Sequence, residues 1–98
     1  MPQTAYQLAA QQERDGLARY RKLGMQTTRS AGSHGYVDGI AWDEKDIFFI
    51  CFRKRFWPVS DREEYLKHIK RPPNSTVIFI EEVGGEEKAY IYRYGQHK

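Results

Sequence analysis

The run from Ile47 to Phe52 reads Ile-Phe-Phe-Ile-Cys-Phe and constrains the fold of this chain more than any other segment. Successive side chains of a strand point to opposite faces of a sheet, so a strand with this sequence is apolar on both faces. The run is also far shorter than the ~20 apolar residues that a membrane-spanning helix needs. It predicts the central strand of a sheet, over 47–53, with helices on the faces of that sheet.

A first helix is predicted from Thr4, as the N-cap, to Leu23, with Gly24 as the C-cap. Gly16 lies inside this helix and should cost about 1 kcal/mol relative to alanine, so a bend or fraying is expected there. Glu13 falls in the apolar stripe, where an unpaired carboxylate is costly. It therefore lies at the edge of the stripe, pairs with a cation, or serves a site.

A second helix is predicted to open at Ser60, whose spacing to Glu63 is that of a capping box, and to end at Pro72-Pro73. Further strands are expected over 25–29, 36–42, 76–83 and 88–94, with turns at 43–46 and 84–85. The order is then α-β-β-β-α-β-β. This predicts one α/β domain over 1–98, with a central mixed sheet flanked by helices.

The chain has 98 residues, of which 40% are hydrophobic and 30% charged, as in a folded domain. A formal charge of +3 permits nucleic-acid binding without proving it. The single cysteine, Cys51, excludes an intrachain disulfide and fits a reducing compartment. The N-terminus lacks the order of a signal peptide, so a cytoplasmic protein without membrane contact is expected.

Asp38 is the strongest candidate for chemistry. If residues 36–42 form a strand, Asp38 shares one face with Ile40 and Trp42 and is held rigidly among apolar neighbours. A divalent cation prefers hard oxygen ligands of this kind. The alternative is a simple turn, because Asp38-Gly39 is also a good turn dipeptide. The apolar residues that follow favour the strand.

The order of these features resembles the core of the archaeal-type Holliday junction resolvases and the wider PD-(D/E)XK, or restriction endonuclease-like, nuclease superfamily. An acidic residue follows a Gly/Ser loop, opens an apolar run and precedes a second apolar strand. The resemblance implies that Asp38 and Glu13 bind Mg²⁺ or Mn²⁺. It further implies that Arg29 and Ser33 lie near the active site and contact DNA, with Ser33 contributing to catalysis.

Half of the family motif is replaced in this chain. Cys51 and Arg53 stand where the resemblance expects the glutamate and lysine of Glu-x-Lys. Arginine binds phosphate but its pKa is too high for proton transfer, and cysteine is a soft ligand poorly suited to Mg²⁺. Arg53 is kept as a catalytic candidate on its charge. Replacement carboxylates are conceivable at positions 63, 64, 81 and 82. A nucleophilic or zinc-binding role for Cys51 lacks the expected Cys/His spacing.

Two basic groups and one small-residue loop are candidates for contacts with the DNA backbone. The loop over 30–35 holds Ser33 and His34 and lets backbone N–H groups approach a phosphate. The alternative is that these are only solvated surfaces. The DNA-binding candidates beyond the loop are Arg19, Arg21, Lys22, Arg29, Lys54 and Arg55.

The resemblance therefore implies a DNA-binding, metal-dependent endonuclease of the junction-resolvase type that prefers branched or four-way junction DNA, with cutting retained, weakened or lost through the replacement of Glu-x-Lys. A homodimer is expected, because a twofold protein matches the near-twofold junction. Its interface could use exposed aromatics, with Phe56, Trp57 and the Tyr90/Tyr92/Tyr94 face as candidates, or these aromatics only cover the small core. The alternatives are an inactive DNA-binding or architectural module on the same fold, and a small interaction protein with no nucleic-acid role.

Overall fold

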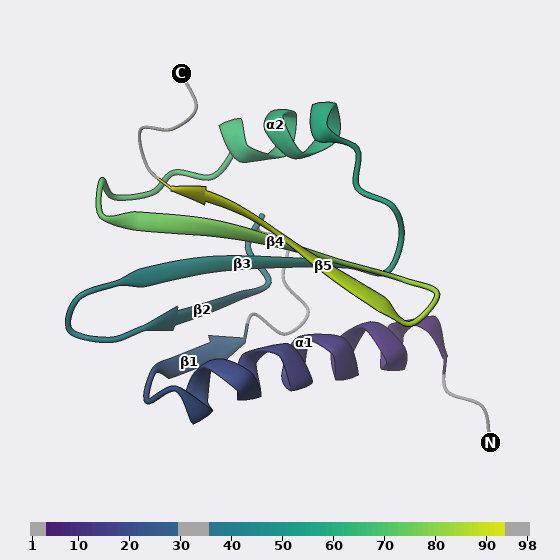
Figure 1. Cartoon of the computed structure of the whole chain (residues 1–98), viewed down its shortest axis with the longest axis horizontal. Coiled ribbons are helices and arrows are strands. Elements are labelled where there is room, and N and C mark those ends of the chain that lie inside the picture. Colours follow the sequence, from purple (N-terminus) through teal and green to yellow (C-terminus); the bar gives the residue numbers. More distant parts are fainter. Residues whose placement is uncertain (1–3, 30–35, 94–98) are drawn as a thin grey trace.

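Five strands form one mixed sheet in the computed structural model, which describes residues 4–29 and 36–93 (Figure 1). In spatial order they are β1 (Gln26–Arg29), β2 (Gly39–Trp42), β3 (Ile47–Arg53), β4 (Ser75–Val83) and β5 (Glu86–Arg93). Neighbouring strands run antiparallel except for β3 and β4, which are parallel. The α/β class, the element order and the central place of β3 agree with the prediction.

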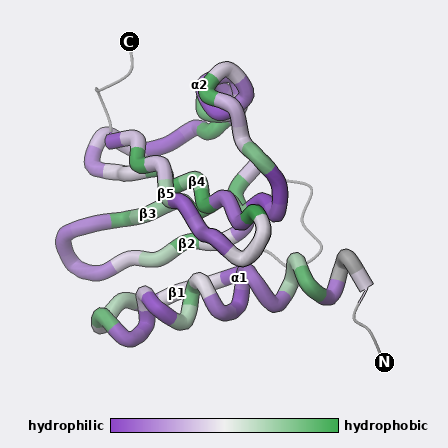
Figure 2. The backbone as a smooth tube through the Cα atoms, turned by 45° about the vertical axis from the view of Figure 1, so that its right-hand side comes forward, coloured by the Kyte–Doolittle hydropathy of each residue, from purple (hydrophilic) through white to green (hydrophobic). Residues whose placement is uncertain are grey.

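The two helices, α1 (Ala5–Lys22) and α2 (Val59–Lys67), pack on opposite faces of the sheet. Ile50 of β3 faces α1 and packs with Leu17, while Cys51 faces α2 and packs with Trp57. In Figure 2 hydrophobic residues lie within β3 and β4, and the β2–β3 turn is hydrophilic. Because β3 is apolar on both faces, one apolar cluster forms on each side of the sheet. Neither helix, within the described part of the chain, is long and apolar enough to cross a membrane.

The first helix is continuous through Gly16, so the helix does not fray there. Its start is as predicted: Thr4 Oγ1 accepts from the N–H of Gln7 at 3.1 Å, and Gln7 returns the bond in a capping box. Leu23 is the C-cap, and Gly24 follows it with φ of 91°, in the left-handed region that favours glycine. The glycine signal therefore marked the helix end correctly but lies just beyond the cap.

Two glycines let α1 lie close to the sheet. A Cβ on Gly39 would lie 2.8 Å from Cδ1 of Leu17, and one on Gly16 would collide with the ring of Phe52. Contacts that close are not compatible with a larger side chain. Gly16 is therefore present for packing, and its neighbours hold it in helical geometry despite its low propensity.

The second helix differs from the prediction at both ends. It begins at Val59 after Pro58, no side-chain cap is formed, and Ser60 lies inside the helix. The capping box from Ser60 to Glu63 is therefore not present. The helix ends at Lys67, well before Pro72, because the chain leaves helical geometry to place Ile69 in the apolar cluster on this side of the sheet.

Candidate functional site

Asp38 lies at the start of β2, on the rim of the sheet. Its backbone N–H donates to the carbonyl of Ile50 at 3.0 Å, and its Oδ2 accepts from the N–H of Phe52 at 2.8 Å. The Asp38 carboxylate thus accepts the hydrogen bond that a backbone carbonyl would accept in a regular strand. The strand β2 itself begins at Gly39 and not at the predicted residue 36. Burial raises the pKa of Asp38, and the bond from Phe52 opposes that rise.

Glu13 lies over the same rim, on α1. Its Oε1 is 3.2 Å from NH1 of Arg29, and both side chains are largely buried. Burial raises the pKa of Glu13, the negative charge of Asp38 raises it further, and Arg29 lowers it. The structure therefore combines two sequence hypotheses: Glu13 pairs with a cation, and it is close enough to Asp38 for the two carboxylates to repel each other.

The close packing of α1 explains how these acids meet. Glu13 is one helical turn before Gly16 and Leu17, the residues where α1 touches β3 and β2. Asp38 immediately precedes Gly39, the other residue in that contact. Small residues at the contact therefore bring a helix carboxylate and a strand-end carboxylate to one place.

Cys51 lies beside Asp38 on the α2 side of the sheet and is fully buried. Its thiol donates to the carbonyl oxygen of Tyr36, with Sγ at 3.2 Å. Burial, and then the charge of Asp38, raise its pKa far above the ordinary range for a thiol. Cys51 is therefore a protonated, buried group at neutral pH, which is the opposite of an activated nucleophile.

Tyr65 of α2 is a member of this site that the sequence interpretation missed. Its pKa is raised to about 12, mainly by burial and then by the electrostatic effects of Cys51 and Asp38. The Tyr65 hydroxyl therefore stays protonated. Its ring packs edge-on against Trp57 and Tyr36, with centroids 5.6 and 5.2 Å apart. In the sequence Tyr65 fitted an apolar helical stripe, and nothing local marked it as a neighbour of Asp38.

Arg53 ends β3 on the same side as Cys51. Its guanidinium lies 4.2 Å from the centroid of the Trp57 ring, and NH1 is 3.9 Å from Oδ2 of Asp61. A cation over an indole face is held by the ring quadrupole. Arg53 is thus at the end of the sheet that carries Asp38, with one face already occupied by Trp57.

The conceivable replacement carboxylates are engaged elsewhere or exposed. Glu81, 3% exposed, accepts from the N–H of Trp57 at 2.6 Å and from the hydroxyl of Tyr90 at 3.4 Å. Glu82 pairs with Lys54 at 2.8 Å. Glu63 and Glu64 are exposed on α2, and Glu64 pairs with Lys67 and His68. None of these pairings involves Asp38.

Much of the predicted basic surface is neutralised within the fold. Arg19 pairs with Glu87, just as Lys54 pairs with Glu82, and the two glutamates are register partners on β4 and β5. Arg29 pairs with Glu13, and Arg21 donates to Oγ1 of Thr27 at 2.8 Å. Lys22 and Arg55 are exposed. Ser33 and His34 lie outside the described residues.

The exposed aromatic surface is smaller than the sequence suggested. Trp57 and Tyr92 are buried in the α2-side cluster, and Tyr90 is half-buried beneath Arg62. The backbone N–H of Trp57 and the hydroxyl of Tyr90 donate to Glu81, and the hydroxyl of Tyr92 accepts from Arg62. Phe56 is 65% exposed, as predicted, and Tyr94 falls outside the described residues.

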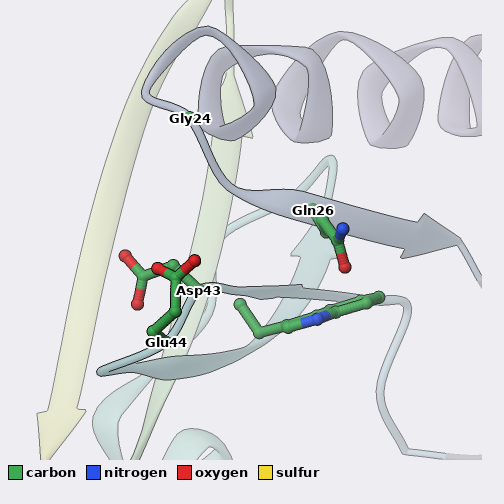
Figure 3. A pocket seen from close by; sticks show the side chains of 5 residues that line it. Gly24, Gln26, Asp43 and Glu44 are labelled. Atoms are coloured by element: carbon green, nitrogen blue, oxygen red, sulfur yellow. The ribbon is translucent and has the colours of Figure 1, made fainter.

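Two hollows lie at the far end of the sheet from Asp38. One, of about 270 Å³, is lined by Gly24, Gln26, Trp42, Asp43 and Glu44. Figure 3 shows Gln26 of β1 together with Asp43 and Glu44 of the β2–β3 turn around it. Hydrogen bonds from the backbone of Lys45 and Asp46 lower the pKa of Asp43, so this carboxylate holds the turn. The other, of about 340 Å³, lies between Asp46 and the start of β4.

Glu13 and Asp38 are the pair of hard oxygen donors at the rim. Within residues 4–29 and 36–93 there is no group of three or more His, Cys, Asp or Glu side chains placed to hold a metal ion. Two carboxylates match the donor set of Mg²⁺, which usually takes one or two from the protein together with water and phosphate. A comparison of the chain with protein-family models, curated proteins and solved structures finds no match.

Proposed function

We propose that this protein is a DNA-binding, divalent-metal-dependent endonuclease of the Holliday junction resolvase type, with a restriction endonuclease-like fold and weakened catalysis. One observation carries the proposal. Glu13 and Asp38 come from different elements and lie at one rim, where burial raises the pKa of each and the negative charge of Asp38 raises that of Glu13 further. Mg²⁺ or Mn²⁺ bound between them would relieve the repulsion, which is what a site prepared for a cation requires.

Each residue of the rim has a definable part in such a reaction. A bound divalent cation would supply charge stabilisation at the phosphate and a water of lowered pKa. Arg29 holds the Glu13 carboxylate in place, and the Phe52 N–H holds that of Asp38. Arg53 and the protonated hydroxyl of Tyr65 can donate hydrogen bonds to phosphate oxygens on the α2 side.

Weak cleavage follows from the same residues. The guanidinium of an arginine binds phosphate but does not take part in proton transfer, so Arg53 can orient a phosphate without acting as an acid or base. Cys51 offers a neutral thiol where a second hard ligand is expected, and Glu81 is held by Trp57 and Tyr90. We therefore propose slow hydrolysis of a phosphodiester in branched DNA, by a homodimer that places one site on each of two strands.

The test is a cleavage assay on a four-way junction and on a linear duplex of the same sequence, with Mg²⁺ or Mn²⁺ and with EDTA. Wild-type protein should cut the junction only with metal, and Glu13→Gln and Asp38→Asn should both abolish the cut. Glu44→Gln is the matched control, because it removes an exposed carboxylate at the far end of the sheet. Cleavage that persists in both rim variants would refute the proposed site.

A second candidate function is favoured by the engagement of Cys51, Arg53 and Glu81. All three are tied into the α2 side of the fold, which suits a scaffold that binds DNA without cutting it. In this case junction binding would fall steeply with salt, as counterion release requires, and would be unchanged by metal. Junction binding without any metal-dependent cleavage would select this candidate over the nuclease.

A further inference from the structure

Phe56 is held out in solvent next to the candidate site. It lies in the connection between β3 and α2, 65% exposed, compared with 45% for Tyr36. It follows the exposed residues Lys54 and Arg55, and Val59 after it is 55% exposed. Single exposed apolar side chains are common on protein surfaces. What distinguishes Phe56 is the way in which the next residue is fixed.

Trp57 is anchored on both sides of its backbone. Its N–H donates to Oε2 of Glu81 at 2.6 Å, and its carbonyl accepts from NH1 of Arg62. Its indole ring packs edge-on against Phe79, with centroids 4.7 Å apart, and Arg53 covers the ring. Residue 57, immediately after Phe56, is therefore fixed at its N–H, its carbonyl and its ring.

The anchors are themselves charged groups that the fold has buried. Arg62 donates from Nε to the hydroxyl of Tyr92 at 3.0 Å and lies 3.6 Å from the centroid of the Tyr90 ring. Glu81 accepts from the Tyr90 hydroxyl as well as from Trp57. Burying an acid and a base is costly unless every polar group is satisfied. Here Arg62 and Glu81 both hydrogen-bond to the backbone of Trp57, and so fix the connection between β3 and α2 in which Phe56 lies.

We propose that Phe56 is a stacking platform for a nucleobase that is unstacked at a DNA branch point, with the exposed Arg55 on an adjoining phosphate, since Lys54 is already paired with Glu82. This inference rests on the proposed function. Aromatic rings bind bases through their faces, and flanking cations hold the backbone. Since consecutive residues advance by at most ~3.6 Å, Phe56 lies within about 14 Å of Phe52, the residue bonded to Asp38. A stacked base would thus be a few nucleotides from the cleaved phosphate.

The alternative occupant is a second copy of the chain, and charge argues against it. A twofold interface places the same surface of each copy in contact. Centred on Phe56, it would bring the exposed Arg55 side chain of one copy against Arg55 of the other. Like charges opposed in this way disfavour association, whereas a polyanion is favoured by them.

The experiment measures binding of a four-way junction, of a linear duplex and of junctions with 2-aminopurine at the branch, all in EDTA. Phe56→Ala and Phe56→Leu should weaken junction binding by about 5- to 150-fold, the effect of losing one stacked base. Phe56→Trp should retain it. Linear-duplex binding should change less than about twofold, and only wild type and Phe56→Trp should quench the branch fluorophore. Leu23→Ala, at a 76% exposed apolar residue, should match wild type.

Each other outcome is decisive. Wild-type protein that binds neither DNA refutes the proposed function, and the inference falls with it. Junction binding by Phe56→Ala equal to wild type refutes the inference and leaves the proposed function standing. Phe56→Leu equal to wild type shows an apolar contact instead of stacking. A dimer in sedimentation that Phe56→Ala dissociates assigns the surface to self-association and overturns the inference.

Discussion

The carboxylate of Asp38 accepts a hydrogen bond from the N–H of Phe52 at 2.8 Å, while the N–H of Asp38 donates to Ile50. The pair continues the β2–β3 ladder beyond the end of β2 through a side chain. The same carboxylate repels Glu13 across the rim. Asp38 therefore closes the edge of the sheet and supplies half of the negative charge proposed to bind metal, and substitutions can separate the two roles.

We expect Asp38→Ala to lower the free energy of unfolding by about 1–3 kcal/mol, because the Phe52 N–H then lacks its acceptor in a partly buried place. Asp38→Asn retains an oxygen for that bond and should change stability by less than about 1 kcal/mol. Urea unfolding followed by circular dichroism measures both. Equal losses in the two variants would show that the charge, and not the hydrogen bond, matters for folding.

The pH dependence of stability should carry the signature of two raised carboxyl pKa values. Burial raises the pKa of both Glu13 and Asp38 above their unfolded values of about 4, so the native state binds more protons than the unfolded state in that window. Their contribution to the unfolding free energy therefore falls as pH rises from about 4 through the raised pKa values.

The double variant Glu13→Gln with Asp38→Asn should remove this decline, and the wild-type minus variant difference isolates it from other groups. If Mg²⁺ binds the native pair, it should restore wild-type stability above the window and have little effect on the variant. Denaturant unfolding at several pH values, with and without Mg²⁺, provides the measurement. A difference curve that rises with pH would contradict the raised pKa values.

Gly16→Ala should destabilise the protein by about 1–3 kcal/mol, although alanine is the better helix former. The added methyl group would collide with the Phe52 ring and push α1 from the sheet. Phe52→Leu in the same chain should recover part of the loss, and a double-mutant cycle measures that coupling. Independent, additive effects of the two substitutions would show that α1 adjusts without strain.

The predictable part of this fold was the part that local patterns determine. The double-sided apolar run at 47–53 gave the central strand, and the Thr4 cap and Gly24 fixed the ends of α1. Ser60 misled because a cap depends on where the chain enters the helix, and here the buried Trp57 sets that entry. The place of Tyr65 in the candidate site, and the hydrogen bonds of Glu81 with Trp57 and Tyr90, depend on contacts between segments that are distant in the sequence. No local spacing of residues encodes such contacts.

A metal site that includes Glu13 and Asp38 is what the resemblance implies and stays a prediction, whereas the packing that brings α1 close to the start of β2 is visible only in three dimensions. Gly16 and Gly39 were interpreted as a weak helix position and as half of a turn dipeptide. Their common function is to let α1 touch the sheet, against Phe52 and Leu17. A sequence pattern records that a residue is small, but not which partner requires it to be small.

The last prediction concerns positions 51 and 53, where the proposed relationship to the nucleases expects glutamate and lysine. Cys51→Glu with Arg53→Lys should give more metal-dependent cleavage of junction DNA than wild type, whose cleavage we expect to be slow or absent. Position 51 is buried beside Asp38, so the new carboxylate should cost several kcal/mol of stability in EDTA and recover with Mg²⁺ or Mn²⁺. The lysine gives up the contact over Trp57 but has a pKa that a site can shift.

Cys51→Gln with Arg53→Lys is the matched control, of similar size and without the charge, and should show no metal rescue of its melting temperature. A double variant that is folded and stabilised by metal, yet cuts no faster than wild type, would indicate that the rim binds a cation without supporting hydrolysis.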